Sequence, residues 1–155
     1  MKNLKEREEV IEYSIKLNTT NLSPLRSGNI SVRGIEDGIE GFFITPSGKK
    51  YDSLKLEDIV FLSLNEEKDF LSWFNTGKNP SSEWRFHQDI YKNKWEAKAI
   101  VHAHSPHASA VSTHGKSIPP FHYMIALAGG ENIRCSEYAT FGTHELSMNI
   151  IKALK

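Results

Sequence analysis

The sequence predicts an α/β protein of the α+β type, in which helices cover a central, mostly antiparallel β-sheet. Stretches rich in β-branched and aromatic residues are interleaved with stretches of helical periodicity, but they do not follow the strict strand, helix, strand order of a parallel sheet. No internal repeat, low-complexity tract or Pro/Gly/Ser-rich linker interrupts the chain of 155 residues. We therefore expect a single domain over residues 1–155.

The first half of the chain predicts one helix followed by strands. The helix runs from Leu4 to Leu17, where Val10, Ile11 and Ile15 recur at helical spacing. The strands that follow are rich in β-branched or aromatic residues and are bounded by turn formers. They are GNISVR (28–33), GFFITPSG (41–48) and LEDIVFLSL (56–64), with KDFLSWF (68–74) as a candidate for a further short strand.

The second half predicts helices around one more strand. Pro80 and Ser81 indicate the start of a helix over SSEWRFHQDIYKN (81–93), with Glu83 in its first turn. A strand at AKAIVHAHS (97–105) and a short helix at HASAVSTHG (107–115) follow, while FHYMIALAG (121–129) could be a helix or a strand. The last helix begins at Thr143 and places apolar residues four apart.

Composition and charge favour a small-molecule partner. The chain has 19 Lys plus Arg and 19 Asp plus Glu, so bulk electrostatics do not attract it to nucleic acid or to an anionic membrane. No apolar run approaches the roughly 20 residues of a membrane-spanning helix, and the N-terminus lacks the apolar core of a signal peptide. We therefore expect a cytoplasmic protein. With a single cysteine, Cys135, any metal would depend on His and carboxylate ligands.

Two histidines lie one residue apart in the predicted strand 97–105. Side chains alternate faces along a strand, so His102 and His104 are expected to face the same space. Two neutral imidazoles suit zinc at about 2.0 Å or a neighbouring transition metal, although a third ligand is then required. The pattern alone leaves open a chance pair at a strand edge. Another histidine, His87, lies four residues after Glu83, and we expect a helical hydrogen bond between these two.

Three short polar segments, RSGNIS, TPSGKK and NPSSEW, are candidates for binding phosphate. Each combines Gly or Ser with backbone N–H groups at a turn or helix start, although each alone is also a common turn. Their candidate residues are Gly28, Asn29, Ser47, Gly48, Ser81 and Ser82. Beside them, Glu83 is either a surface residue favoured by the helix dipole or a general acid/base whose pKa is raised by burial.

Several of these motifs occur together in one order: SGNISVR, ITPSGKKYDSL, PSSEWRFH, AIVHAHSPHASAVS, IPPFHYMIALAGG and YATFGTHELS. In them the chain resembles the class II aldolase/adducin superfamily, and SSEWRFH and HYMIALAGG resemble its fuculose-phosphate branch. The resemblance implies a three-layer fold and a zinc-dependent lyase that cleaves a ketose 1-phosphate, such as L-fuculose 1-phosphate, to dihydroxyacetone phosphate and an aldehyde. Pentulose-phosphate 4-epimerase, thiosugar-phosphate dehydratase and a non-catalytic adducin-like scaffold remain alternatives.

The resemblance also implies roles for individual residues. His102 and His104 would bind one zinc ion per subunit, and Glu83 would be the acid/base and a further ligand. Tyr123 would reach the site of a neighbouring subunit in a homotetramer, and the six loop residues would bind the substrate phosphate. The family's third zinc histidine lies shortly beyond the helix in which this chain ends. Since NIIKALK also lacks a C-cap glycine, we expect the domain to be incomplete at its C-terminus.

Overall fold

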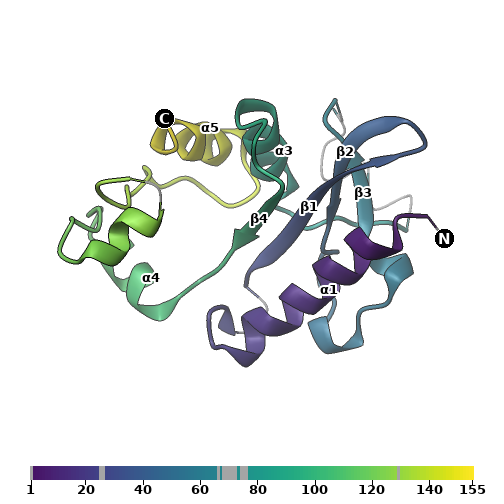
Figure 1. Ribbon diagram of the computed structural model, residues 1–155, viewed down its shortest axis with the longest axis horizontal. Coiled ribbons are helices and arrows are strands. Elements are labelled where there is room, and N and C mark those ends of the chain that lie inside the picture. Colours follow the sequence, from purple (N-terminus) through teal and green to yellow (C-terminus); the bar gives the residue numbers. More distant parts are fainter. Residues whose placement is uncertain (1, 25–26, 66, 68–72, 74–76, 129) are drawn as a thin grey trace.

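The protein folds into three layers, with a β-sheet between helices on its two faces (Figure 1). The computed structural model describes residues 2–24, 27–65, 67, 73, 77–128 and 130–155. Helix α1 lies on one face of the sheet, and helices α3 and α5 lie on the other. The predicted α+β class and the three-layer arrangement are therefore confirmed.

The sheet has four strands in the order β3-β2-β1-β4, and every neighbouring pair is antiparallel. Its strands are β1 (Asn29–Glu36), β2 (Ile39–Ile44), β3 (Val60–Ser63) and β4 (Ala99–His102). Strands β1 and β2 form a hairpin through Asp37 and Gly38, whose φ values of 52° and 80° are those of a tight turn that matches the strand twist. Strand β4 comes from far along the chain and places His102 opposite Asn29.

Helix α1 (Leu4–Thr19) covers the first face and extends two residues beyond the predicted end. Its Val10 and Leu17 pack against Ile30 and Phe43 of the sheet. Arg7 is buried beside this cluster, where its guanidinium pairs with the Glu36 carboxylate at 2.7 Å and also donates to the Ile59 carbonyl. A buried guanidinium needs such partners, because an unpaired one would lose its hydration without compensation.

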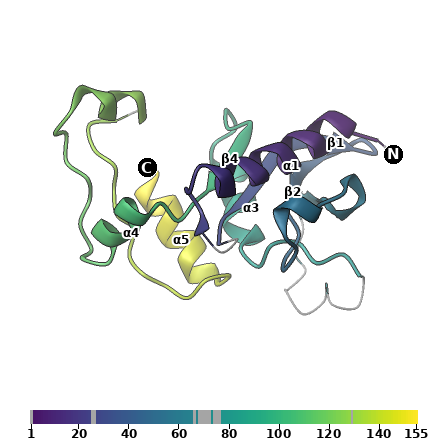
Figure 2. The same ribbon diagram turned by 90° about the horizontal axis from the view of Figure 1, so that it is seen from below.

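Helix α3 (Trp84–Asn93) packs on the opposite face. Its apolar side, with Trp84 and Tyr91, contacts Phe42 and neighbouring residues of β2 and β3. Helix α5 (His144–Ala153) begins where predicted, because the Thr143 hydroxyl accepts a hydrogen bond from the Leu146 N–H. It packs on α3, as Figure 2 also shows.

Other predicted elements differ in extent or type. The predicted strand 56–64 begins only at Val60, because its first residues form a 3₁₀ turn, η3 (Leu56–Asp58). The predicted strand 97–105 is shortened to β4, and the short helix is α4 (Pro106–Ser112). The undecided stretch 121–129 forms a 3₁₀ helix, η4 (Tyr123–Ala128), and a further 3₁₀ turn is η2 (Tyr51–Ser53). The candidate strand 68–74 lies outside the described residues apart from the buried Trp73.

The segment from α4 to η4 extends away from the sheet in both views (Figures 1 and 2). Several of its large apolar side chains are exposed, among them Phe121, Tyr123 and Leu127. Among the residues with described positions, no helix combines the length and the apolar character needed to cross a membrane.

Candidate active site

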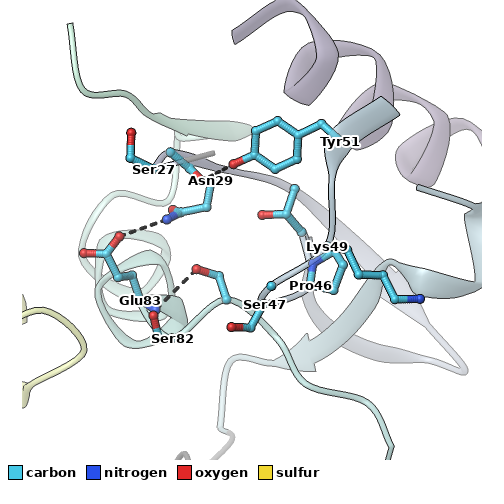
Figure 3. A pocket seen from close by; sticks show the side chains of 12 residues that line it. Ser27, Asn29, Pro46, Ser47, Lys49, Tyr51, Ser82 and Glu83 are labelled. Atoms are coloured by element: carbon cyan, nitrogen blue, oxygen red, sulfur yellow. Dashed lines mark hydrogen bonds between the residues drawn. The ribbon is translucent and has the colours of Figure 1, made fainter. Parts of the chain in front are cut away.

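The structure brings the three predicted polar loops together around one pocket of about 280 Å³ (Figure 3). The loops come from the chain before β1, the chain after β2 and the start of α3. All six predicted loop residues line it, and Glu83 lies at its side. The lining consists of Ser27, Gly28, Asn29, Thr45, Pro46, Ser47, Gly48, Lys49, Tyr51, Ser81, Ser82 and Glu83.

Backbone contacts hold two of these loops side by side. The Ser81 N–H donates to the Thr45 carbonyl at 2.9 Å, and the Ser47 N–H donates to the Asn79 carbonyl at 2.9 Å. These two N–H groups are therefore used within the protein, which differs from the exposed N–H groups expected there. The contacts leave the Ser47 and Ser82 side chains at the pocket, where Figure 3 shows their hydroxyls.

The third loop is fixed by tight packing around Gly28. A Cβ at this position would lie 2.4 Å from the His102 carbonyl oxygen and 2.4 Å from Ser23 Oγ, so a larger residue does not fit. The buried Tyr51 hydroxyl donates to the Gly28 carbonyl and supports the loop from the other side. No local pattern indicates this role of Tyr51, because the residue lies in a separate 3₁₀ turn.

The pocket contains one lysine, Lys49, among the residues that line it. Its ammonium group pairs with the Asp58 carboxylate, and the hydrogen bond from Lys49 holds the pKa of Asp58 below its ordinary value. In Figure 3 the Lys49 side chain points away from Glu83. Hydroxyl and backbone dipoles, more than a full positive charge, therefore face the interior of this pocket.

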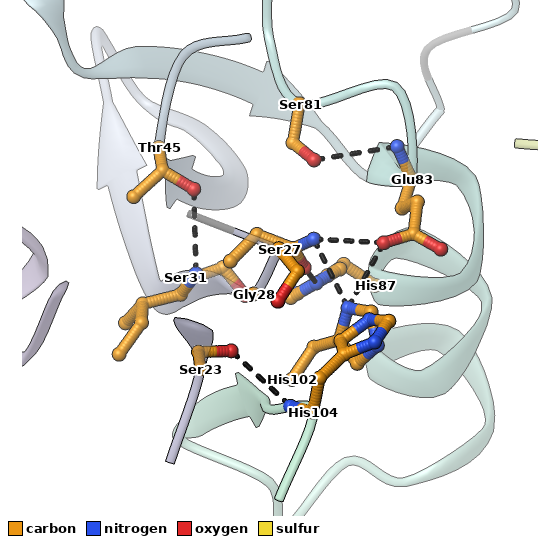
Figure 4. Close-up of polar contacts among 12 residues, drawn as sticks. Ser23, Ser27, Gly28, Ser31, Thr45, Ser81, Glu83, His87, His102 and His104 are labelled. Carbon is orange, nitrogen blue, oxygen red and sulfur yellow. Dashed lines mark hydrogen bonds and ion pairs between the residues drawn. The ribbon is translucent and has the colours of Figure 1, made fainter. Parts of the chain in front are cut away.

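Glu83 lies at the junction between the pocket and the histidine pair (Figure 4). It is the N-cap residue of α3, one position before the first turn in which it was predicted. Its Oε2 accepts a hydrogen bond from Asn29 Nδ2 at 2.9 Å and lies 2.9 Å from His102 Nδ1. Asn29 Nδ2 also lies 3.1 Å from His102 Nδ1, so the three side chains form one polar cluster.

The pKa of Glu83 lies below its ordinary value. Burial of the side chain raises this pKa, but the hydrogen bond and charge of His102, together with the Asn29 hydrogen bond, lower it by more. The expected increase of the pKa by burial is therefore wrong. Glu83 is a carboxylate at neutral pH, which is the form that accepts a proton.

His102 and His104 face the same space, as the strand alternation predicts. Their ring centroids are 4.7 Å apart, although β4 itself ends at His102. The His104 N–H donates to Ser23 Oγ at 3.2 Å, which fixes the chain just beyond the strand. Partial burial and the nearby His102 lower the pKa of His104, so its imidazole is neutral at neutral pH.

Two imidazoles and a carboxylate are donor types that suit zinc. Glu83 Oε2 and His102 Nδ1 are 2.9 Å apart, and two atoms bound to one tetrahedral zinc ion lie roughly 3.3 Å apart. Within the described ranges, however, no three His, Cys, Asp or Glu side chains are grouped so that they could hold a metal ion. The donor types therefore fit zinc, whereas the three side chains do not form a closed site.

His87 does not bind Glu83, so that expectation is wrong. Because Glu83 precedes the helix, the two side chains are not stacked as residues four apart within a helix are. Instead, His87 is fully buried, with Nδ1 2.7 Å from Ser31 Oγ and Nε2 in contact with Asn29 Oδ1. Burial lowers the pKa of His87 to about 3.

Tyr123 is not brought into this pocket. It lies on η4 with 78% of its surface exposed, and its ring contacts the neighbouring His122. Tyr123 lines a separate hollow together with nearby residues, including Ile125 and Glu131.

Comparison with known proteins gives the same family for most of the chain. The family model described as "Class II Aldolase and Adducin N-terminal domain" matches residues 8–155. The L-fuculose phosphate aldolase of Escherichia coli strain K12 is 43% identical over 155 residues, which are 100% of this chain and 67% of that protein. A 5-methylthioribulose-1-phosphate/5-deoxyribulose-1-phosphate aldolase of Rhodospirillum rubrum is 41% identical over 149 residues, 96% of this chain and 63% of its own length.

Solved structures show the same fold. An L-fuculose 1-phosphate aldolase superposes with a TM-score of 0.84 at 35% sequence identity, covering 99% of this chain and 69% of its own. An L-fuculose-1-phosphate aldolase from Thermus thermophilus has a TM-score of 0.73 at 24% identity, covering 96% of this chain and 70% of its own. The chain thus spans about two thirds of the length of these relatives.

Proposed function

The chain belongs to the class II aldolase and adducin family, and on that premise we propose that it is a lyase that cleaves a ketose 1-phosphate. The products would be dihydroxyacetone phosphate and an aldehyde. The observation that supports this proposal best is a pocket in which a hydroxyl-rich loop cluster adjoins the Glu83, Asn29 and His102 side chains. A phosphate at the loops would place the neighbouring carbons of a sugar beside Glu83.

The substrate class follows from what the relatives share. The relatives from E. coli and R. rubrum are named for different sugars, but both names denote aldolases of a phosphorylated ketose. We take L-fuculose 1-phosphate as the first substrate and 5-deoxyribulose 1-phosphate as the second. Both sugars carry the same phosphorylated end, and we propose that the loop pocket holds this end.

The loop residues would bind and orient the phosphate. The hydroxyls of Ser47, Ser81 and Ser82 lie around the pocket, and the backbone at Gly28 and Gly48 comes close to its interior. Binding of this kind raises turnover when it places the reacting carbons correctly in the transition state. Because Lys49 is paired with Asp58, the pocket would hold the phosphate mainly through hydroxyl and amide dipoles.

We propose that zinc binds at the histidine pair, with His102, His104 and Glu83 as ligands, since these donor types suit it. When bound there, the ion would supply Lewis-acid stabilisation of negative charge at the carbonyl oxygen of the substrate. The neutral state of His104 and the ionised state of Glu83 are the forms that bind a metal ion.

Glu83 would move the proton at the C3 carbon of the substrate. Cleavage takes the proton of the C4 hydroxyl to a base, breaks the C3–C4 bond and leaves its electron pair on an enediolate. The Glu83 carboxylate takes up a proton from water and gives it to C3, while the base returns the C4 hydroxyl proton to water; in the reverse direction the Glu83 carboxylate removes the proton from C3. The proton lost at the C4 hydroxyl and the proton gained at C3 balance over one turnover. The lowered pKa of Glu83 favours the carboxylate that begins the reverse reaction.

Tyr123 would act at the aldehyde half of the site in a neighbouring subunit. Tyr123 is exposed and lies on a segment that extends away from the sheet of its own chain. Exposed large apolar side chains on the same segment favour contact with another copy, because such patches mark association surfaces. We therefore propose a homotetramer with sites between subunits.

The test is release of dihydroxyacetone phosphate from L-fuculose 1-phosphate, coupled to a reductase that oxidises NADH. We expect release that depends on added zinc and is abolished by EDTA. The same assay with 5-deoxyribulose 1-phosphate would rank the two sugars. Absence of product from both sugars with zinc saturating would contradict the proposal.

Mass spectrometry of the products separates the other functions. An epimerase would return a compound of unchanged mass, and a dehydratase would return one that has lost water. A scaffold like adducin would leave the sugar intact. The presence of Glu83, His102 and His104 in one region favours a catalytic protein over a scaffold.

A further inference from the structure

A line of buried polar side chains runs beneath the pocket from helix α3 to Glu83. The Tyr91 hydroxyl lies 2.9 Å from Ser31 Oγ, and Ser31 Oγ lies 2.7 Å from His87 Nδ1. His87 Nε2 contacts Asn29 Oδ1, and Asn29 Nδ2 reaches Glu83. We propose that His87 is a positioning residue, which fixes the orientation of the Asn29 amide and so directs its NH₂ group to Glu83.

The donors and acceptors along this line fit one arrangement. In this arrangement the Tyr91 hydroxyl donates to Ser31, and the Ser31 hydroxyl donates to His87 Nδ1. His87 then has its proton on Nε2 and donates it to the Asn29 carbonyl oxygen. With its oxygen occupied, the Asn29 amide presents its NH₂ group to the other side, where Glu83 Oε2 accepts at 2.9 Å.

The opposite arrangement is unfavourable at Glu83. A His87 ring with its proton on Nδ1 would need a donor at Nε2, which the Asn29 NH₂ group could supply only after the amide rotates by 180°. The Asn29 oxygen would then face the Glu83 carboxylate at a separation of about 2.9 Å, where both atoms are acceptors. The arrangement without facing acceptors is therefore the one in which His87 donates from Nε2 to the Asn29 oxygen and the Asn29 NH₂ group reaches Glu83.

Close packing fixes these side chains and excludes water from them. His87 and Ser31 are fully buried, and Asn29 and Tyr91 are buried almost completely. The Phe86 ring stacks on His87 with centroids 4.6 Å apart and meets the edge of the His102 ring at 5.4 Å. Burial also keeps the His87 ring neutral, with a pKa of about 3, so its role does not change between pH 5 and 8.

The inference changes the role of Asn29. The loop motif suggested that Asn29 binds phosphate, but its side-chain amide is already engaged by Glu83 and His87. The Asn29 side chain would therefore position Glu83, the proposed acid/base. This effect on turnover rests on the proposed function, whereas the proton position on His87 does not.

The first test reads that proton position directly in the protein. Long-range ¹H–¹⁵N correlation spectra of the ¹⁵N-histidine-labelled chain distinguish the two neutral forms and the protonated form of each ring. The His87 signal is assigned by its loss in His87→Gln. We expect a neutral ring with the proton on Nε2 from pH 5.5 to pH 8. A ring with its proton on Nδ1, or one protonated at pH 5.5, would overturn the inference.

The second test compares two variants in the dihydroxyacetone phosphate assay. His87→Phe keeps a ring of similar size without a donor, and His87→Gln places an N–H donor close to the position of Nε2. We expect His87→Phe to lower kcat by roughly 10-fold to 100-fold with KM changed less than about twofold, and His87→Gln to recover part of that loss. Equal losses in both variants, or a folded His87→Phe with normal kcat, would contradict a positioning role.

The two tests also separate this inference from the proposed function. If the unmodified chain releases no dihydroxyacetone phosphate, the proposed function fails, and the spectra still decide the proton position on His87. Thermal unfolding of each variant identifies losses that come from unfolding. Should His87→Phe fail to fold, the spectra of the unmodified protein and the kcat of His87→Gln still decide the inference.

Discussion

The pocket and the segment from α4 to η4 differ in how their side chains are held. Around the pocket each important side chain has partners within the chain: Asn29 and His102 for Glu83, and Ser31 and Asn29 for His87. On the outer segment, Tyr123 and several apolar neighbours face solvent. We infer that one chain builds the phosphate and acid/base half of the site, while the aldehyde half depends on a second copy.

The largest effect is expected at the histidine pair. His104→Ala removes one proposed ligand from an exposed position, so the fold should remain and bound zinc should be lost together with activity. Metal content by atomic emission and the dihydroxyacetone phosphate assay measure the two effects. A variant that keeps stoichiometric zinc would show that His104 is not a ligand.

A smaller but large loss is expected for Glu83→Gln. The amide keeps the shape of the side chain but cannot accept or give the proton, so kcat should fall by about 100-fold or more. Binding of inorganic phosphate, measured by calorimetry, should change little because the loop hydroxyls remain. Near-normal kcat would exclude Glu83 as the acid/base.

For the outer segment, Tyr123→Phe removes a hydroxyl group with no effect expected on stability, because the side chain is exposed. We expect kcat to fall by about 10-fold, with the melting temperature unchanged, if the hydroxyl serves the aldehyde oxygen. Unchanged kcat would show that the Tyr123 hydroxyl takes no part in the chemical step.

Mixing two variants sharpens the comparison between the regions. If the two halves of a site come from different subunits, refolding Glu83→Gln together with Tyr123→Phe creates some sites with both residues intact. The mixture should then exceed the activity of either variant alone. Activity equal to the average of the two would place both residues in one subunit's site.

The smallest effect concerns stability and pH. His87 has a pKa of about 3 in the folded protein and about 6.5 when unfolded, so the unfolded chain binds more protons in this interval. Stability therefore falls as the pH decreases below 6.5. From pH 6.5 to pH 5.5 the contribution of His87 is a loss of about 1 kcal/mol in the free energy of unfolding.

Urea unfolding of the unmodified protein and of His87→Gln at both pH values checks this effect. The difference between the two proteins isolates His87 from the other six histidines. A variant with the same pH dependence as the unmodified protein would contradict the assignment of a depressed pKa to His87.

Local patterns were sufficient for most elements of the fold. The helical spacing of Val10 and Ile11 predicted α1, and Thr143 marked the start of α5, because capping and periodicity act within a few residues. The α+β class followed from the order of these elements. The end of β4 at His102 could not be predicted, since it depends on how far β1 extends beside it.

The contacts of the site depend on residues far apart in the sequence. Strand alternation was enough to place His102 and His104 in the same space. The pKa direction of Glu83 was missed, because it follows from Asn29 and His102, which are distant in sequence. The partners of His87 were missed for the same reason, since Ser31 lies 56 residues earlier in the chain.

The pairing of β1 with β4 places Asn29 opposite His102, and this register has a consequence for how the sequence can change. An insertion or deletion of one residue within β4 would move the imidazole to the other face of the sheet. A deletion of two residues would restore the face but place His104 instead of His102 opposite Asn29. Natural variants of this protein should therefore vary in length in the loops that flank residues 99–104 and keep constant spacing within them.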